Sequence, residues 1–311
     1  MELIVSNDKE IYDITELANS VSYTDKLNDG CSKLEFNVTD SDVKIENANE
    51  VRFVYDDIKF SGFVFKHGRN KKGETTVTAY DQLRYAKAKD TIVAQKDTAT
   101  TLTKRMCNYF NLRTGKLTDT KYILPTEPHE DKTWLDIIYG AIRETLVNKG
   151  TWYSLRDENG LIALRDIDEL KLDLVLGDKS LVYDYDYQKS IDDNFYNQIK
   201  IYVKGKDDKT VGHFVSAKSD GSIKRYGLLQ YFEAMENKNA SQAKSKADML
   251  LKLYNHEAEI LSLECLGDTR IRAGSSFYGQ IEDIEFEKTL IVRSVTHKFI
   301  PIHTMQIEVA I

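Results

Sequence analysis

The chain has 311 residues, of which 41% are hydrophobic and 30% are charged, and its formal net charge is −7. This composition is typical of folded protein and excludes a chain that is disordered throughout. A net negative charge disfavours nucleic-acid binding as the main task, because phosphate backbones attract basic surfaces. The length accommodates two or three domains.

The cysteines and the apolar stretches indicate the cellular compartment in which the protein is found. Cys31, Cys107 and Cys265 are far apart and odd in number, which argues against a disulfide framework and against a zinc ribbon. The first residues do not resemble a secretory signal, and no apolar stretch approaches the roughly 20 residues that span a bilayer. We therefore expect a soluble protein that is made in the cytoplasm and does not insert into a membrane.

Residues 1–88 have the two-residue period of β-strands. Leu34, Phe36 and Val38 alternate with polar residues, and residues 58–80 contain further alternating runs on either side of a turn. Several short strands at such spacing are typical of a small sandwich or barrel. We predict a first β-barrel domain over residues 1–88.

The next segment changes to a helical period. One helix can be capped by Asp97 or Thr98, and a second begins near Thr133 with Trp134 on its apolar stripe. An Asn-Gly pair after the second helix signals a tight hairpin. We predict an α+β domain over residues 89–178, with Trp134 in the core that the two helices share with the hairpin.

Strands return near residue 179, with one further helix among them. The predicted elements are strands over residues 181–187, 197–203 and 209–216, a helix near 239–259, and a closing hairpin over 290–311. Asn239 is a plausible helix cap. In the closing strand Met305, Ile307, Val309 and Ile311 alternate with polar or small residues, as in a strand that is buried on one face. We predict a second β-barrel domain over residues 179–311.

Common signatures of catalysis and cofactor binding are missing from the sequence. It has no phosphate-binding loop and no nucleophile elbow, and its six histidines never fall at metal-ligand spacings. His297 and His303 flank the last turn, and we interpret them as surface or packing residues. We therefore predict no catalytic residues, no cofactor-binding residues, no metal ligands and no cofactor, so that the protein is not an enzyme.

Four carboxylates near the start of the third segment are the main candidates for chemistry. Asp184, Asp186, Asp192 and Asp193 are clustered, and such clusters bind calcium or supply an acid/base pair for glycan cleavage. The spacing and the glycine of a calcium loop are missing, however, and tyrosine alternates with aspartate over residues 183–187. We interpret this run as a strand with one solvated face.

A basic cluster lies at the predicted tip of the first hairpin. It consists of Lys66, Arg69, Lys71 and Lys72. One interpretation is a polar turn that also protects a sheet edge, and the other is a docking contact for an acidic partner. The sequence leaves both open.

Four parts of the chain carry a resemblance to a known family. They are Asp13–Tyr23 with Lys33–Phe36, Ala79–Tyr85, Ser190–Ile199, and Ser294–Phe299 with the final strand. They look like the opening strands, the close of a first barrel, the lead-in to a second barrel and its end. In order and spacing they resemble the baseplate hub proteins of contractile phage tails, of the kind also carried by PBSX-like defective prophages and R-type bacteriocins.

This resemblance implies a structural protein with a β-rich α+β fold, in which two small β-barrels flank an intervening α+β domain. It implies a homotrimer that links a hexameric tail tube to a trimeric central spike and meets other baseplate proteins. The protein would lie in the bacterial host cytoplasm during assembly and then in the baseplate of a phage or tailocin particle. The hairpins at 58–80 and 290–311, with His67 and His297 at their strand ends, are the candidate tube-facing units.

Two other functions stay open at this point. One is a peptidoglycan hydrolase that uses the carboxylates between Asp184 and Asp193; clearing of purified cell walls, lost on Asp→Asn change, would support it. The other is a glycan-binding tail component, which needs exposed aromatic side chains. Trp134 and Trp152 are the two tryptophans, and the periodicity places Trp134 inward.

Overall fold

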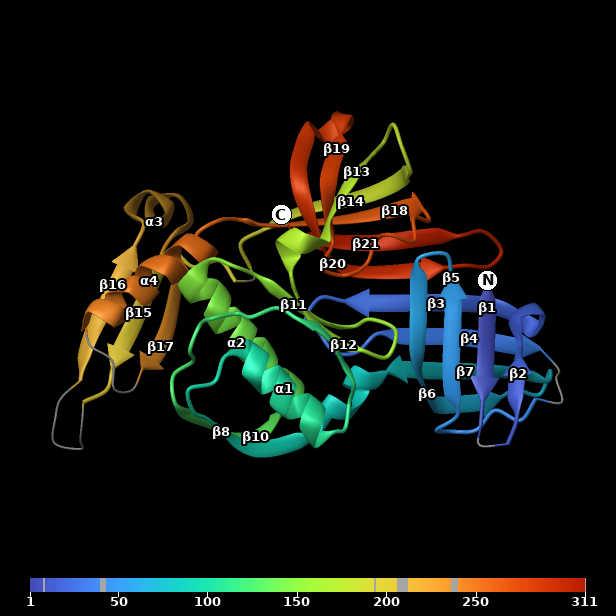
Figure 1. Cartoon of the computed structure of the whole chain (residues 1–311). Coiled ribbons are helices and arrows are strands. Elements are labelled where there is room, and N and C mark those ends of the chain that lie inside the picture. Colours follow the sequence, from blue (N-terminus) through green and yellow to red (C-terminus); the bar gives the residue numbers. More distant parts are fainter. Residues whose placement is uncertain (8, 40–42, 193, 206–211, 236–239, 311) are drawn as a thin grey trace. The chain divides into compact units, whose positions relative to one another are not determined.

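The computed structural model describes residues 1–7, 9–39, 43–192, 194–205, 212–235 and 240–310 (Figure 1). The chain forms two compact units. The first contains residues 1–145, 151–186 and 261–311, and the second contains residues 146–150 and 187–260. Asp193, Lys209, Asn239 and Ile311, which entered the predictions above, lie outside the described residues.

A 13-stranded, mostly antiparallel sheet forms the framework of the first unit. Its strands are β1 (Glu2–Ser6), β2 (Ile11–Asp13), β3 (Ala18–Lys26), β4 (Lys33–Thr39), β5 (Glu50–Tyr55), β6 (Ile58–Arg69), β7 (Glu74–Asp81), β13 (Lys171–Gly177), β14 (Val182–Ser190), β18 (Ala258–Leu266), β19 (Ser276–Ile281), β20 (Phe286–Lys298) and β21 (Thr304–Ala310). Eleven of them follow the order β14-β18-β21-β20-β3-β4-β7-β6-β5-β1-β2, and β19 joins β20 to β13. The β-rich character that the two-residue periods predict is confirmed.

Strands from the two ends of the described chain pair directly in this sheet. Lys26 of β3 lies opposite Ser294 of β20 in an antiparallel ladder. The hydroxyls of Thr24 and Thr296 are 3.1 Å apart on the same two strands. The strands predicted as two separate barrels thus belong to one hydrogen-bonded sheet, and two separate barrels are not confirmed. Alternation along a strand indicates its buried face but does not identify the strand with which it pairs.

The N-terminal part of the sheet curls around its own core. Figure 1 shows β1, β2 and β5 crossing the direction of β3, β4 and β7. Leu34, Phe36 and Val38 of β4 are buried there, as their alternation predicts. Gly62 of β6 permits the close approach of β7, because a Cβ atom at this position would lie 2.2 Å from the carbonyl oxygen of Tyr80.

Helices and short strands of the middle segment complete the first unit. They are η2 (Gln82–Lys87), β8 (Lys89–Ala94), α1 (Ala99–Tyr109), β9 (Thr114–Leu117), β10 (Glu127–Thr133), α2 (Trp134–Lys149), β11 (Tyr153–Asp157), β12 (Ile162–Asp166) and η3 (Ile167–Leu170), with η1 (Thr15–Leu17) and η4 (Glu282–Ile284) in the outer segments. The Thr98 hydroxyl accepts from the amide of Thr101 and caps α1. The Thr133 hydroxyl accepts from the amide of Asp136 at 3.0 Å and caps α2. Both predicted helix starts are confirmed.

The predicted hairpin and its core are also present. Asn159 and Gly160 have φ values of +58° and +81° between β11 and β12, the left-handed pair that a two-residue hairpin turn requires. Trp134 is 3% exposed in a cluster that contains Leu102 and Met106 of α1 and residues of β11 and β12. The shared core predicted around Trp134 is therefore confirmed.

The second unit is a small sheet with a helix packed on one face. Its elements are β15 (Gln198–Val203), β16 (His213–Lys218), α3 (Asp220–Tyr226), β17 (Gln230–Met235) and α4 (Ala240–Tyr254), with strand order β16-β15-β17. Ala243, Ala247 and Leu250 of α4 pack against Ile199 and Ile201 of β15. The strand over 197–203 and the helix near 239–259 are confirmed, whereas α3 and β17 were not predicted.

Candidate functional site

The aspartates weighed in the sequence lie at or after an edge strand of the main sheet. Asp184 and Asp186 of β14 are both exposed, as a solvated strand face predicts, and Asp192 is exposed beyond the strand. Asp193 lies outside the described residues. Among the residues that the structure describes, no three His, Cys, Asp or Glu side chains are grouped so that they could hold a metal ion.

The basic cluster lies at the exposed tip of the β6–β7 hairpin. Lys66, Lys71 and Lys72 are exposed. The turn is organised by Asn70, whose side-chain oxygen accepts from the amides of Lys72 at 2.9 Å and Glu74 at 3.1 Å. This geometry is compatible with a protective turn and with a docking contact.

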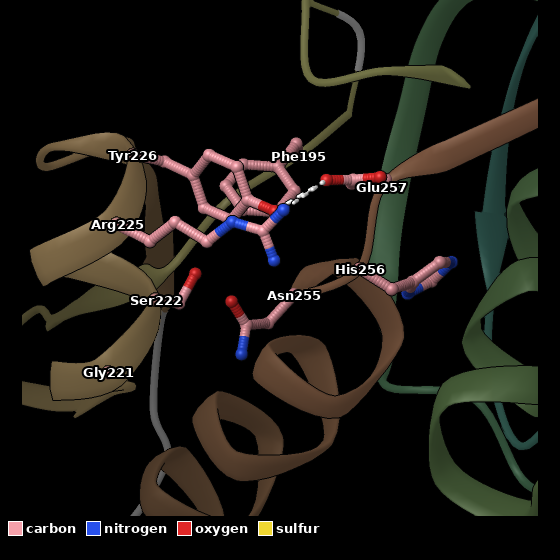
Figure 2. A pocket seen from close by; sticks show the side chains of 8 residues that line it. All are labelled: Phe195, Gly221, Ser222, Arg225, Tyr226, Asn255, His256 and Glu257. Carbon is pink, nitrogen blue, oxygen red and sulfur yellow. Dashed lines mark hydrogen bonds and ion pairs between the residues drawn. The ribbon is translucent and has the colours of Figure 1, made fainter. Parts of the chain in front are cut away.

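A hollow of about 290 Å³ lies in the second unit between α3 and the end of α4 (Figure 2). Three of its polar groups are engaged with one another: the Tyr226 hydroxyl donates to Glu257 at 2.5 Å, and the Arg225 guanidinium lies 3.6 Å from the same carboxylate. Phe195 meets the Tyr226 ring edge to face. Because Arg225 is 72% exposed, the hollow is open to solvent beside this side chain.

The most unusual polar feature of the first unit is a buried ionic network. Arg272 precedes β19 and donates through Nε to Asp25 Oδ2 of β3 at 2.9 Å. Its two terminal nitrogens donate to the carbonyl oxygen of Asp157 in β11 at 3.2 Å. The Ser32 hydroxyl donates to Asp25 Oδ1 at 3.0 Å, and the Ser32 amide donates to Asp81 Oδ2 of β7 at 2.7 Å. The network therefore links residues from all three predicted segments of the sequence, 1–88, 89–178 and 179–311.

Burial and neighbouring charges together shift the pKa values of the carboxyls in this network. Burial alone would raise the pKa of Asp25, but Arg272 and Arg156 hold it below its ordinary value. Burial and the neighbouring Asp157 raise the pKa of Asp81 well above its ordinary value. Burial also raises the pKa of Asp157 to about 6. The Asp81–Asp157 pair therefore holds a proton at a pH at which an exposed aspartate is ionised.

Two histidines lie next to this network, in β20 and in the turn that follows it. His297 is fully buried, and its Nε2 donates to the carbonyl oxygen of Ile271 at 2.9 Å. In the neutral ring Nδ1 is then the acceptor, and it lies 3.0 Å from Nε2 of His303. Burial is the main cause that lowers the pKa of His297 to about 4, and the nearby His303 and Arg272 act in the same direction. The packing interpretation is confirmed for His297, whereas His67 is exposed.

We expect His297 to make the protein less stable in acid. An unfolded histidine has a pKa of 6.5, and in the folded protein this pKa is about 4. As the pH falls the unfolded state binds the proton first, so stability that is present above pH 6.5 is lost between pH 6.5 and about 4. A shift of this size corresponds to about 3 kcal/mol. Urea unfolding at a series of pH values measures this loss.

The buried carboxyls of Asp81 and Asp157 also change the stability in this pH range, so the unfolding experiment needs a control variant. Because the pKa of Asp157 is raised from 3.8 to about 6, the folded state retains a proton that the unfolded state loses, and this contribution falls as the pH rises through that range. His297→Asn keeps the carboxyls and removes the imidazole. The variant should lose less stability than the wild type between neutral pH and pH 4. Parallel pH profiles for the two proteins would contradict the assignment to His297.

The fold of the chain is similar to that of phage tail proteins of known structure. It superposes on a prophage MuSo2 43 kDa tail protein from Shewanella oneidensis with a TM-score of 0.74 and 10% identity, over 100% of this chain and 98% of that one. An E. coli component of the type VI secretion system, described as similar to the T4 tail proteins gp27 and gp5, gives a TM-score of 0.58 at 11% identity, over 94% of this chain and 73% of that one.

The sequence defines the family more narrowly. The PBSX phage-like element protein XkdQ of Bacillus subtilis (strain 168) is 28% identical over 255 residues, which are 80% of this chain and 77% of the relative. Residues 21–310 match the model of the YQBQ-like family. The chain belongs to the YQBQ-like family, and the resemblance to a baseplate-type phage protein is confirmed. No helix in the described part of the chain is long and apolar enough to cross a membrane.

Proposed function

We propose that the protein is a non-enzymatic structural hub of a phage or tailocin baseplate, which links a hexameric tail tube to a trimeric central spike. The observation that carries this proposal is the phage-tail fold over the whole chain, with sheet strands from both ends of the sequence joined at β3 and β20. The likeness to a PBSX protein supports the phage setting. The proposed location is the host cytoplasm during assembly and then the particle.

The strand order supports two similar halves on either side of the β3–β4 pair. On one side the order continues β7-β6-β5, and on the other it continues β20-β21-β18. Each half contains a long hairpin whose register shifts once, between Val64 and Lys66 in β6 and between Val292 and Ser294 in β20. Two such halves in each of three subunits would present six similar units to a six-fold tube. This proposal includes the division of the chain into three domains. They are a first barrel over residues 1–88, an α+β domain over residues 89–178 and a second barrel over residues 179–311.

The test is an image of the assembled hub at subunit resolution. We expect a homotrimer in which the half around β6–β7 superposes on the half around β20–β21, and in which the two alternate at equal radius about one three-fold axis. Halves that do not superpose, or that lie at unequal radii, would contradict the hub function. A six-fold neighbour on one side and a three-fold neighbour on the other would identify the tube and the spike.

A further inference from the structure

The buried network of the first unit contains more carboxyl groups than counter-charges. In the described part of the chain, its charged side chains are Asp25, Asp81, Asp157, Arg156 and Arg272. The three aspartates and Arg156 are at most 8% exposed, and the side chain of Arg272 is 15% exposed. Three ionised carboxylates would outweigh the two guanidinium groups by one charge. One bound proton makes the buried cluster neutral, whereas an uncompensated charge is costly in such a place.

The other titratable groups near the two carboxyls do not change this balance. Burial raises the pKa of three groups that interact electrostatically with Asp81, so that they stay uncharged; they are Tyr23 of β3, Cys31 before β4 and Tyr139 of α2. Glu158 lies 3.7 Å from Arg156, but it is 31% exposed and pairs with Arg165 at 2.9 Å. The basic groups of η2 that act on Cys31 are half-buried or exposed; they are Arg84 and Lys87.

The hydrogen-bond donors around the two carboxyls favour the charge on Asp81 and the proton on Asp157. Asp81 Oδ2 accepts from the Ser32 amide at 2.7 Å, and Oδ1 accepts from the Leu83 amide at 2.9 Å. Asp157 Oδ1 accepts from the Gly160 amide at 2.6 Å, but its buried Oδ2 has no partner within the described structure. Donors to both oxygens stabilise a carboxylate, and a proton binds most readily to an oxygen that receives none. Because carboxyls that repel one another titrate as a pair, the pair can retain this one proton.

The two carboxyls connect a hairpin turn with the end of a sheet strand. Asp81 ends β7 and caps η2 through the Leu83 amide. Asp157 ends β11, and its carboxyl binds the amide of Gly160 in the turn between β11 and β12. The Gln82 amide at the start of η2 is close enough to lower the pKa of Asp157, although it does not form a hydrogen bond with Oδ2. Repulsion between the two carboxyls therefore acts directly between the turn at 157–160 and the corner at 81–83.

We propose that the Asp81–Asp157 pair is a proton-dependent latch between the β11–β12 turn and the corner at which β7 meets η2. With the proton on Asp157 the buried cluster is neutral and the latch is closed. When the proton leaves as the pH rises, the cluster carries one uncompensated negative charge, and the turn opens so that water can hydrate it. The open turn exposes Asp157 and binds the proton less tightly, so opening becomes more favourable with rising pH. The latch belongs to the single chain and does not depend on the hub function.

Infrared spectroscopy of the purified full chain tests where the proton lies. At about pH 6 the folded wild type should show the band of a protonated carboxyl group. The band should be missing in Asp157→Asn and present in Asp186→Asn, which changes an exposed aspartate of β14. Asp81→Asn removes an acceptor of two backbone amides and should be less stable than Asp157→Asn. A wild type without the band, or a band that persists in Asp157→Asn, would reject the assignment even if Asp81→Asn does not fold.

Hydrogen exchange of the segment 153–161, followed by mass spectrometry, tests the opening. From about pH 5 to about pH 8 the protection of the wild type should fall at least about tenfold after correction for the intrinsic pH dependence of exchange. The reason is that the pKa of Asp157 is about 6 in the closed latch and 3.8 when the side chain is exposed. Asp157→Asn keeps the shape of the side chain without a titrating proton, so its protection should change less than about twofold.

The same measurement contains the outcomes that decide against the latch. His297 is present in both proteins, so its titration cancels in the comparison, and Asp186→Asn should behave as the wild type does. Protection that does not change with pH in the wild type would overturn the proposal. An equal pH dependence in the wild type and in Asp157→Asn would also overturn it, because the opening would then be independent of this carboxyl.

Discussion

Replacing Trp134 by alanine should lower the free energy of unfolding of the first unit by roughly 3–5 kcal/mol. The side chain is 3% exposed at the first turn of α2. It packs against the rings of Tyr109 and Phe110 at the end of α1, with ring centres 5.6 and 6.3 Å away. Alanine would leave a cavity where two helices and a hairpin meet. Urea unfolding followed by tyrosine fluorescence and by circular dichroism measures the change.

Two variants control this experiment. Trp134→Phe should cost much less, because it keeps most of the ring volume and because the buried indole nitrogen has no hydrogen-bond partner within the described structure. Trp152→Ala removes the other tryptophan, which is only partly buried beside the same core, and should also cost less. An unchanged denaturation midpoint in Trp134→Ala would contradict the placement of α2 in this core.

Replacing Arg272 by methionine should destabilise the first unit by about 3–5 kcal/mol. The guanidinium is the counter-charge of the buried Asp25 carboxylate, with Nε 2.9 Å from Oδ2. Without it the carboxylate stays in a dry environment with only the Ser32 hydroxyl and the more distant Arg156. Asp25 must then either remain ionised at high cost or take up a proton. Chemical denaturation at neutral pH measures the loss.

The neighbouring Arg270 provides a matched control. It forms an ion pair with Asp268 at 2.6 Å, but its side chain is 50% exposed. Arg270→Met should therefore change stability by at most about 1 kcal/mol. Adding Asp25→Asn to Arg272→Met should recover part of the lost stability, because the buried charge is removed. Equal effects of the two arginine substitutions would contradict the importance of burial.

Local signals in the sequence predicted the local structure of the middle segment. The hydroxyls of Thr98 and Thr133 cap helices within three residues of themselves, and the pair at 159–160 turns a hairpin by its own backbone preference. The buried position of Trp134 is predicted by the period of the apolar residues along the same helix. Such features need no knowledge of distant residues, so a single sequence is sufficient to predict them.

The buried network lacked any comparable signal. Asp25 and Arg272 are 247 positions apart, and neither lies in a recognisable motif. Their contact depends on the pairing of β3 with β20, which alternation alone does not encode. A partial signal existed for His297, because Val295, His297 and Phe299 are buried at every second position along the end of β20 and just beyond it. Interpreted by that period, His297 is a core residue.

The pairing of β3 with β20 has a consequence for synthesis on the ribosome. Thr24 and Thr296 are 272 positions apart, so β3 emerges long before its neighbour has been translated. Until then one edge of β3 has no strand to pair with, and the main sheet cannot close. Closure of the sheet must wait until β20 is free of the ribosome, and contacts of such long sequence separation form slowly. The nascent chain therefore presents an open strand edge for most of its elongation, which makes this period its main exposure to aggregation.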